Sequence, residues 1–318
     1  MAARDTDFGR LITAMVTPFD RNGAVDFAQA GRLARTLIDN GTDSLVVSGT
    51  TGESPTLTTD EKLRLFRVVK EAVAGRARVI GGTCNYSTAE SIELTHAAGD
   101  GGPRERAIDG VLMVVPYYNN PPQEGLYRHF RSIAEHTDLP CVLYNVPSRT
   151  VRNMEAATTI RLARDVPNIV GLKEAVGSME QVAEIIAGVP DDFRVWSGND
   201  SDTFSIMCLG GYGVVSVASH VVGRQIKRMI ARVVEGDLRG AAQLHLKLLP
   251  LARALFPPVA PVASPSAIKA ALNLSGFDVG GLRLPLIELP EPAQARLKDL
   301  LATYDLDRLP APAAPAAA

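Results

Sequence analysis

Lys173 closes an apolar run, IVGLKE, that begins at Ile169. A lysine amine is a nucleophile only when deprotonated, and burial among apolar side chains favours the neutral amine because desolvation penalises the charged form. A buried lysine at the end of a strand could therefore form a Schiff base with a keto substrate. An ion pair between Lys173 and Glu174 at the surface explains the same run equally well, so neighbouring segments must decide between the two.

Polar residues also follow three other apolar runs, in the segments GTTGESPTLT, VPYYNNPP and LYNVPSRT. The glycines of the first segment allow the backbone to approach a ligand closely. The side chains that these segments supply belong to Thr50, Thr51, Ser54, Tyr117, Tyr118, Tyr144 and Arg149. An ordinary glycine-rich turn and packing tyrosines are the alternatives, but a lysine, proton-passing hydroxyl groups and a guanidinium that clamps a carboxylate suit a keto-acid reaction.

Eight apolar runs must position these residues; they begin at Leu11, Ser44, Arg78, Asp109, Pro140, Ile169, Arg194 and Gly213. Runs without polar alternation are typical of parallel strands that are covered on both faces. Helical periodicity between them, as in residues 60–74 and 127–136, and capping-box spacings at Thr58, Ser87 and Ser178 indicate alternating helices. The sequence therefore predicts a (β/α)8 barrel, a TIM barrel, with its chemistry at the carboxyl ends of the strands.

The domain organisation follows from where these runs stop. Residues 1–222 are predicted to form the barrel, and residues 223–308, which are helical without further strand signals, a C-terminal helical domain. Residues 309–318 are rich in alanine and proline and are predicted to be a disordered tail.

Composition limits the partners. A net charge of -2 gives no reason to expect nucleic acid or an anionic membrane, and the N-terminus lacks the apolar run of a signal peptide, which predicts a cytoplasmic protein. Three cysteines without a C-x-x-C pair argue against disulfides and zinc, and we interpret Cys84, Cys141 and Cys208 as small buried hydrophobes. The five histidines lack metal-ligand spacing, so no metal and no cofactor is predicted.

Five segments, GTTGE, PYYNNPPQEGLYRHF, YNVPSRT, GLKEA and SGND, occur in an order and spacing that resemble the dihydrodipicolinate synthases of the pyruvate-dependent class I aldolase superfamily. The resemblance covers roughly residues 10 to 300. It implies a barrel with a C-terminal helical domain, assembled as a homotetramer of tight dimers. It further implies condensation of pyruvate with L-aspartate 4-semialdehyde, to give 4-hydroxy-tetrahydrodipicolinate for diaminopimelate and lysine biosynthesis.

The resemblance also implies roles for single residues. Lys173 would be the Schiff-base lysine, and Thr50, Tyr144 and Tyr118 would relay protons, with Tyr118 reaching the neighbouring subunit's site. The residues implied in substrate binding are Thr51 for the pyruvate carboxylate, Arg149 for the semialdehyde carboxylate, and the backbones of Gly198 and Val215. Lysine-sensitive relatives bind their inhibitor at positions that correspond here to Ser54, Pro55, Thr59, Lys62, Tyr86, Glu90 and Tyr117.

Two segments depart from the sequence pattern of the family. Residues 98–110 are longer and more charged than usual in the family and are interpreted as a surface insertion, and the segment after Phe256 lacks the family's N-P-x-P-V-K run.

Two alternative functions are also considered. They are a sister Schiff-base aldolase, such as an N-acetylneuraminate lyase or a 2-keto-3-deoxy sugar acid aldolase, and a non-catalytic barrel that binds a keto acid. The arginine of NVPSRT favours the synthase over the sister lyases, which typically lack it.

Overall fold

A closed barrel of eight parallel strands forms the centre of the molecule in the computed structural model, which describes residues 7–102, 105–256 and 264–309. Each strand pairs with the next, and β8 pairs with β1. The strands are β1 Leu11–Ala14, β2 Ser44–Val47, β3 Arg78–Gly81, β4 Gly110–Val114, β5 Cys141–Asn145, β6 Ile169–Glu174, β7 Arg194–Ser197 and β8 Gly213–Ser216. The predicted (β/α)8 barrel is confirmed, and every strand begins within one residue of its predicted start.

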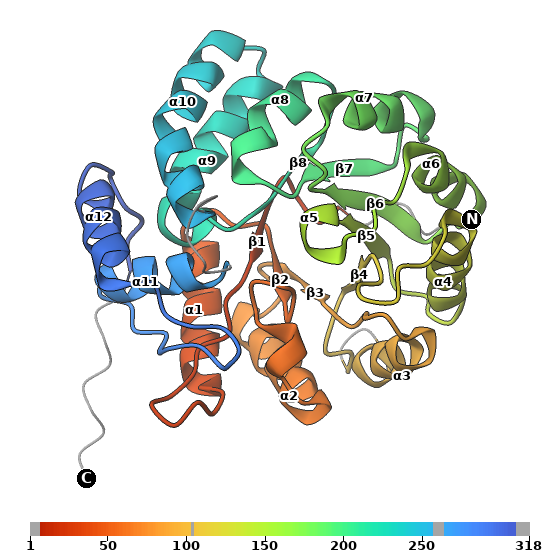
Figure 1. The fold of residues 1–318 in the computed structure, drawn as a ribbon, viewed down its shortest axis with the longest axis horizontal. Helices are drawn as coiled ribbons and strands as arrows, with labels where there is room; N and C mark the ends of the chain where they lie inside the picture. Colours follow the sequence, from red (N-terminus) through yellow and green to blue (C-terminus); the bar gives the residue numbers. More distant parts are fainter. Residues whose placement is uncertain (1–6, 103–104, 257–263, 310–318) are drawn as a thin grey trace.

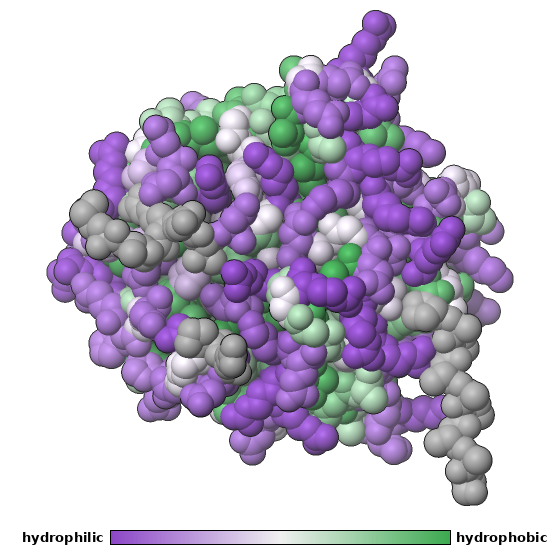
Figure 2. All heavy atoms as spheres, turned by 180° about the vertical axis from the view of Figure 1, so that it is seen from behind, coloured by the Kyte–Doolittle hydropathy of each residue, from purple (hydrophilic) through white to green (hydrophobic). Residues whose placement is uncertain are grey.

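Helices surround the strands, while α10, α11 and α12 gather on one side of the barrel (Figure 1). The helices are α1 Phe27–Asp39, α2 Thr59–Val73, α3 Thr88–Gly99, α4 Gln123–Glu135, α5 Pro147–Thr150, α6 Ala156–Asp165, α7 Met179–Gly188, α8 Thr203–Cys208, α9 Ser219–Val234, α10 Leu238–Leu255, α11 Ser266–Leu274 and α12 Glu291–Leu301, with short 3₁₀ turns η1 Ser54–Thr56 and η2 Asp200–Asp202. Among the described residues, none of the helices is long and apolar enough to span a membrane. Seen from behind, the surface is mainly hydrophilic with separate hydrophobic patches (Figure 2).

Burial explains why the strands lack polar alternation. Every residue of β1, β2, β5, β6 and β8 is buried, because side chains face either the barrel interior or the surrounding helices. In β3 and β7 the first residue, Arg78 or Arg194, is exposed, and the rest of each strand is buried. The apolar runs in the sequence therefore record burial on both faces.

One of the three predicted capping boxes forms completely. Thr58 accepts a hydrogen bond from the Glu61 backbone N–H at 3.2 Å, and the Glu61 carboxylate accepts one from the Thr58 N–H at 2.9 Å. At α7, Ser178 caps the helix, but the Gln181 side chain donates to Glu174 at 3.3 Å instead of reaching back. The box at α3 is likewise half formed: Ser87 caps the helix, but the Glu90 carboxylate accepts a hydrogen bond from the Asn85 amide.

The structure corrects the predictions for the cysteines and for the insertion, and it does not describe most of the predicted tail. The prediction of three buried cysteines is wrong for Cys208, which is exposed near the end of α8, whereas Cys141 is buried and Cys84 half-buried. The predicted insertion at 98–110 is not wholly on the surface, because Ala107 and Ile108 are buried beside β4. Of the predicted tail, residues 310–318 lie outside the described residues.

The predicted domain boundary at residue 222 falls inside α9. Val222 has non-helical backbone angles, φ -137° and ψ 30°, so the helix kinks at that point. α9 also packs on β1. The division into 1–222 and 223–308 stays a prediction.

Candidate active site

A cavity of about 200 Å³ opens at the carboxyl ends of β2, β3, β4 and β5. Its lining consists of Ser48, Gly49, Thr50, Ser54, Pro55, Gly82, Cys84, Leu112, Val114, Tyr117, Tyr144, Val146, Arg149 and Thr150. Three residues predicted to take part in catalysis or substrate binding, Thr50, Tyr144 and Arg149, thus meet in one space. The carboxyl ends of barrel strands are where (β/α)8 enzymes hold their active sites.

Lys173 lies next to this cavity, at the end of β6. It pairs in register with Tyr144 of β5, and its Nζ lies 3.9 Å from the centroid of the Tyr144 ring. The Lys173 residue is only 5% exposed, and its neighbours along the strand, Leu172 and Glu174, are also buried. Sequence analysis left open whether this lysine is buried or forms a surface ion pair, and burial decides in favour of the buried amine.

Glu174 points to a different set of partners. Its carboxylate accepts hydrogen bonds from the Asn145 amide at 3.0 and 3.2 Å and from the Gln181 amide at 3.3 Å. Burial raises the pKa of Glu174 to about 7, although these hydrogen bonds oppose the shift. Successive strand residues face opposite sides of a sheet, so Lys173 and Glu174 separate, and the surface ion pair considered from the sequence is wrong.

Asp200 is a carboxyl group near Lys173 that sequence reasoning missed. It accepts hydrogen bonds from the backbone N–H groups of Val217 at 2.9 Å and Ala218 at 3.0 Å, and it also bonds to Ser216. Burial raises the pKa of Asp200, while the charge of Lys173 lowers it. The signal was available, because Asp200 closes the SGND segment that carried the resemblance.

A tight turn of residues 49–54 carries Thr50 and Thr51. The Glu53 N–H donates to the Thr50 carbonyl at 3.1 Å, and the Ser54 N–H donates to the Gly49 carbonyl at 3.2 Å. The backbone is closely approached at Gly52, because a Cβ atom there would lie 3.1 Å from the Met15 carbonyl oxygen and 3.2 Å from the Ser48 backbone. Thr51 is buried but does not line the cavity.

The remaining predicted site residues lie apart from the cavity lining. Tyr118 is 95% exposed, with a left-handed backbone at φ 74°. The Gly198 N–H donates to the Glu174 carbonyl at 2.6 Å, where a Cβ on Gly198 would collide with Ala175 at 2.7 Å. Val215 is buried in β8. Sequence reasoning missed several residues that do line the cavity: Ser48, Gly82, Cys84, Leu112, Val114, Val146 and Thr150. Ser48, Gly82 and Val146 directly follow a strand end, which is the signal that could have identified them.

Most of the positions predicted for an inhibitor site lie close to one another or to this cavity. The rings of Tyr86 and Tyr117 meet edge to face with centroids 5.2 Å apart. Burial lowers the pKa of Lys62, and the charge of Glu90 opposes that shift. Glu90 also accepts a hydrogen bond from Asn85 at 2.8 Å. Ser54 and Pro55 line the cavity itself, and Thr59 begins α2.

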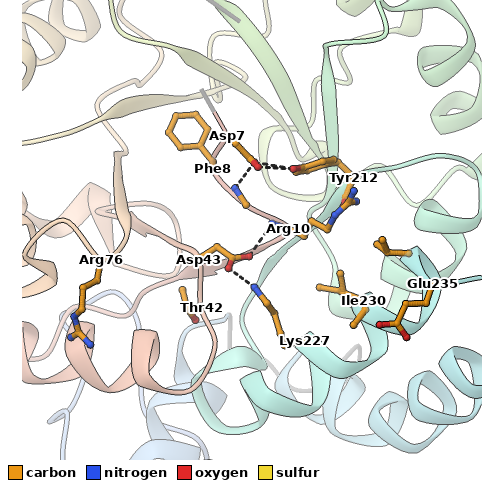
Figure 3. Close-up of a pocket in the computed structure, with 13 residues that line it drawn as sticks. Asp7, Phe8, Arg10, Thr42, Asp43, Arg76, Tyr212, Lys227, Ile230 and Glu235 are labelled. Carbon is orange, nitrogen blue, oxygen red and sulfur yellow. Dashed lines mark hydrogen bonds and ion pairs between the residues drawn. The ribbon is translucent and has the colours of Figure 1, made fainter. Parts of the chain in front are cut away.

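A second, wider cavity of about 530 Å³ lies at the opposite end of the barrel (Figure 3). Most of its charged side chains already have partners within the chain. The Arg10 guanidinium lies 4.1 Å from the centroid of the Tyr212 ring, and the Asp43 carboxylate accepts the Arg10 backbone N–H at 3.0 Å and pairs with Lys227. Residues at the amino ends of barrel strands typically serve stability, so the first cavity is the candidate active site.

Within the described residues, no group of three or more histidine, cysteine, aspartate or glutamate side chains could hold a metal ion. The most buried histidine is His220, and both of its ring nitrogens contact backbone groups. Its Nε2 accepts a hydrogen bond from the Val16 N–H at 3.2 Å, and its Nδ1 lies 2.8 Å from the Val217 carbonyl oxygen. Burial lowers the pKa of His220 to about 4, so the ring is neutral at pH 7.

Comparisons with known proteins agree with this geometry. The model of the dihydrodipicolinate synthetase family matches residues 7–304. A protein of Dehalococcoides mccartyi named 4-hydroxy-tetrahydrodipicolinate synthase is 54% identical over 301 residues, which cover 95% of this chain and 98% of that protein. The synthase of the same name from Bacillus subtilis is 49% identical, covering 93% and 99%. The crystal structure of the Cyanidioschyzon merolae enzyme with lysine bound superposes with a TM-score of 0.88 at 48% identity, covering 93% of this chain and 97% of that one.

Proposed function

This chain belongs to the dihydrodipicolinate synthetase family, and we propose that it condenses pyruvate with L-aspartate 4-semialdehyde to give 4-hydroxy-tetrahydrodipicolinate. The relatives that carry this activity in their name are about half identical over nearly their whole length. The observation that carries the proposal is the buried amine of Lys173, held against Tyr144 beside a cavity at the carboxyl ends of the strands. This step belongs to diaminopimelate and lysine biosynthesis.

The chemistry begins at Lys173. The amine, once it has lost its proton, attacks the keto carbon of pyruvate, water leaves, and a protonated imine forms. Loss of a proton from the methyl carbon gives an enamine, which attacks the aldehyde carbon of the second substrate and forms the new carbon–carbon bond. The amine of the bound semialdehyde then displaces Lys173 and closes the ring, so each turnover releases one water and regenerates the lysine.

Proton transfer is assigned to three hydroxyl groups. Thr50 and Tyr144 line the same cavity, which supports their role as neighbours in a relay. Tyr118 is exposed on its own chain, which suits a hydroxyl that completes the relay of a neighbouring subunit. The proposal therefore includes assembly into tight dimers, and pairs of these into a homotetramer.

Substrate binding is assigned to residues around the cavity. Arg149 lines the cavity from α5 and is proposed to receive the carboxylate of the semialdehyde, since a guanidinium binds a carboxylate through two hydrogen bonds. Thr51 is proposed to bind the pyruvate carboxylate, and the backbones of Gly198 and Val215 to border the pocket.

We infer a barrel at 1–222, a helical domain at 223–308, a cytoplasmic location, and catalysis without a cofactor or a metal. Neither a sister aldolase for sugar acids nor a non-catalytic barrel is favoured by a particular observation. For the sugar-acid aldolases, the cavity presents Arg149, which suits a second carboxylate rather than sugar hydroxyls.

Borohydride trapping tests the assignment directly. Reduction in the presence of pyruvate should add one reduced pyruvate adduct, located by peptide mass spectrometry at Lys173, and the enzyme should then turn over the semialdehyde. Lys173→Ala should abolish both signals. An adduct on another lysine, or normal turnover by Lys173→Ala, would show that the catalytic assignment is wrong.

The inhibitor cluster suggests weak regulation. The Cyanidioschyzon merolae relative was crystallised with lysine bound. The resemblance to the family implies an asparagine at the position of Tyr86 in lysine-sensitive enzymes. Here Tyr86 packs on Tyr117, and the Lys62 ammonium lies near the only carboxylate among these seven positions, Glu90. We infer that L-lysine inhibits this enzyme weakly or not at all.

A further inference from the structure

Glu53 is a buried carboxylate in the turn that carries Thr50 and Thr51, and the proposed chemistry gives it no role. Its Oε1 lies 2.6 Å from the Nζ of Lys269, and both side chains are almost completely shielded from solvent, at 0% and 1% exposure. Lys269 belongs to α11, so this pair joins the turn to the C-terminal helices.

The backbone of Glu53 is strained. Its φ of 57° and ψ of 36° place it in the left-handed region, which a non-glycine residue enters only at a cost. The N–H of Glu53 donates to the Thr50 carbonyl, and its carbonyl accepts the Thr56 N–H at 2.9 Å. This conformation therefore fixes the turn directly after the two threonines.

Contacts of the side chain hold that conformation in place. Besides its ion pair with the Lys269 ammonium through Oε1, the Glu53 carboxylate accepts the Arg283 backbone N–H on Oε2 at 3.1 Å. Lys269 in turn donates to the Gly281 carbonyl at 2.7 Å, and its Nζ lies 4.0 Å from the centroid of the Phe19 ring. The turn, α11 and the segment at Arg283 are distant in the sequence and meet at this carboxylate, which is shielded from solvent.

We propose that Glu53 is a positioning residue for the reaction, and that the buried Lys269 ammonium anchors its carboxylate so that Thr50 and Thr51 are held at the active site. The inference rests on the proposed function, because that function gives Thr50 and Thr51 their roles in proton transfer and pyruvate binding. Strain at a residue beside reacting groups is typical of a preorganised site, in which a displacement of about 1 Å can cost roughly a hundredfold in rate.

The test compares Glu53→Gln with the double variant Glu53→Gln/Lys269→Met, which leaves no unpaired charge in the interior. The matched control is Lys70→Met, which breaks the partly buried Lys70–Asp109 pair at the amino ends of the strands. For each protein, kcat, KM for both substrates, the rate of borohydride trapping with pyruvate and the thermal midpoint are measured on the folded fraction.

A positioning role predicts that both Glu53 variants lose about tenfold to a hundredfold in kcat and in trapping rate. Lys70→Met should lose thermal stability but keep both rates. If the folded double variant keeps the wild-type kcat and trapping rate, or if neither Glu53 variant folds, the pair is structural and the inference is overturned. Failure of the wild type to form product would instead refute the proposed function, and trapping with pyruvate would still measure the positioning effect.

Discussion

Raising the pH from 4.5 to 8 should destabilise the protein through one buried carboxyl group, Glu174. Its pKa is raised from the ordinary 4.5 to about 7, mainly because burial removes the carboxylate from water. Below pH 4.5 the group is protonated in both the folded and the unfolded chain. Between 4.5 and 7 the unfolded chain loses this proton and the folded chain keeps it, so the free energy of unfolding falls as the pH rises. A shift of this size corresponds to about 3 kcal/mol.

Urea unfolding of wild type and Glu174→Gln at fixed protomer concentration measures the effect, because the glutamine cannot titrate. The free energy of unfolding of the wild type should fall by about 3 kcal/mol relative to the variant between pH 4.5 and 8. Glu135→Gln, which changes an exposed carboxylate on α4, is the matched control and should follow the wild type. Parallel pH curves for wild type and Glu174→Gln would refute the reasoning.

Two further predictions concern ligands. Arg149→Ala should raise the KM for the semialdehyde and lower kcat while the pyruvate adduct still forms, as steady-state kinetics and trapping will show; an unimpaired complete reaction would contradict the role of Arg149. L-lysine should inhibit the wild type weakly, and Tyr86→Asn, by supplying an amide to the ligand, should tighten inhibition by about tenfold to a hundredfold, the equivalent of one buried hydrogen bond. Submillimolar inhibition of the wild type in a lysine titration would refute this second prediction.

The strands were the most predictable part of the fold, for a physical reason. A parallel strand buried on both faces needs a continuous apolar run, and a run of this kind can be read directly from the sequence. Lys173 could be located in the same way, since it ends such a run. The alternative interpretation of Lys173, a surface ion pair with Glu174, could also have been rejected from the sequence, because adjacent strand residues face opposite sides of the sheet.

Contacts between distant segments were not predictable. Nothing in the sequence near Glu53 indicates that its partner is Lys269, because the pairing depends on how the C-terminal helices pack against the barrel. Similarly, the half-formed cap at α7 arises because Gln181 is drawn to Glu174, a contact that spacing rules do not contain. Local patterns report backbone structure, whereas the polar interior depends on three-dimensional packing.

The pairing of β8 with β1 has a consequence for biosynthesis of the chain on the ribosome. The barrel cannot close until residues 213–216 have been made, some two hundred residues after β1. At about 5 to 20 residues per second, β1 waits on the order of ten to forty seconds with one edge unpaired. A nascent chain that stalls before β8 exposes open strand edges at both ends of an incomplete sheet, the state in which chaperone capture competes with aggregation.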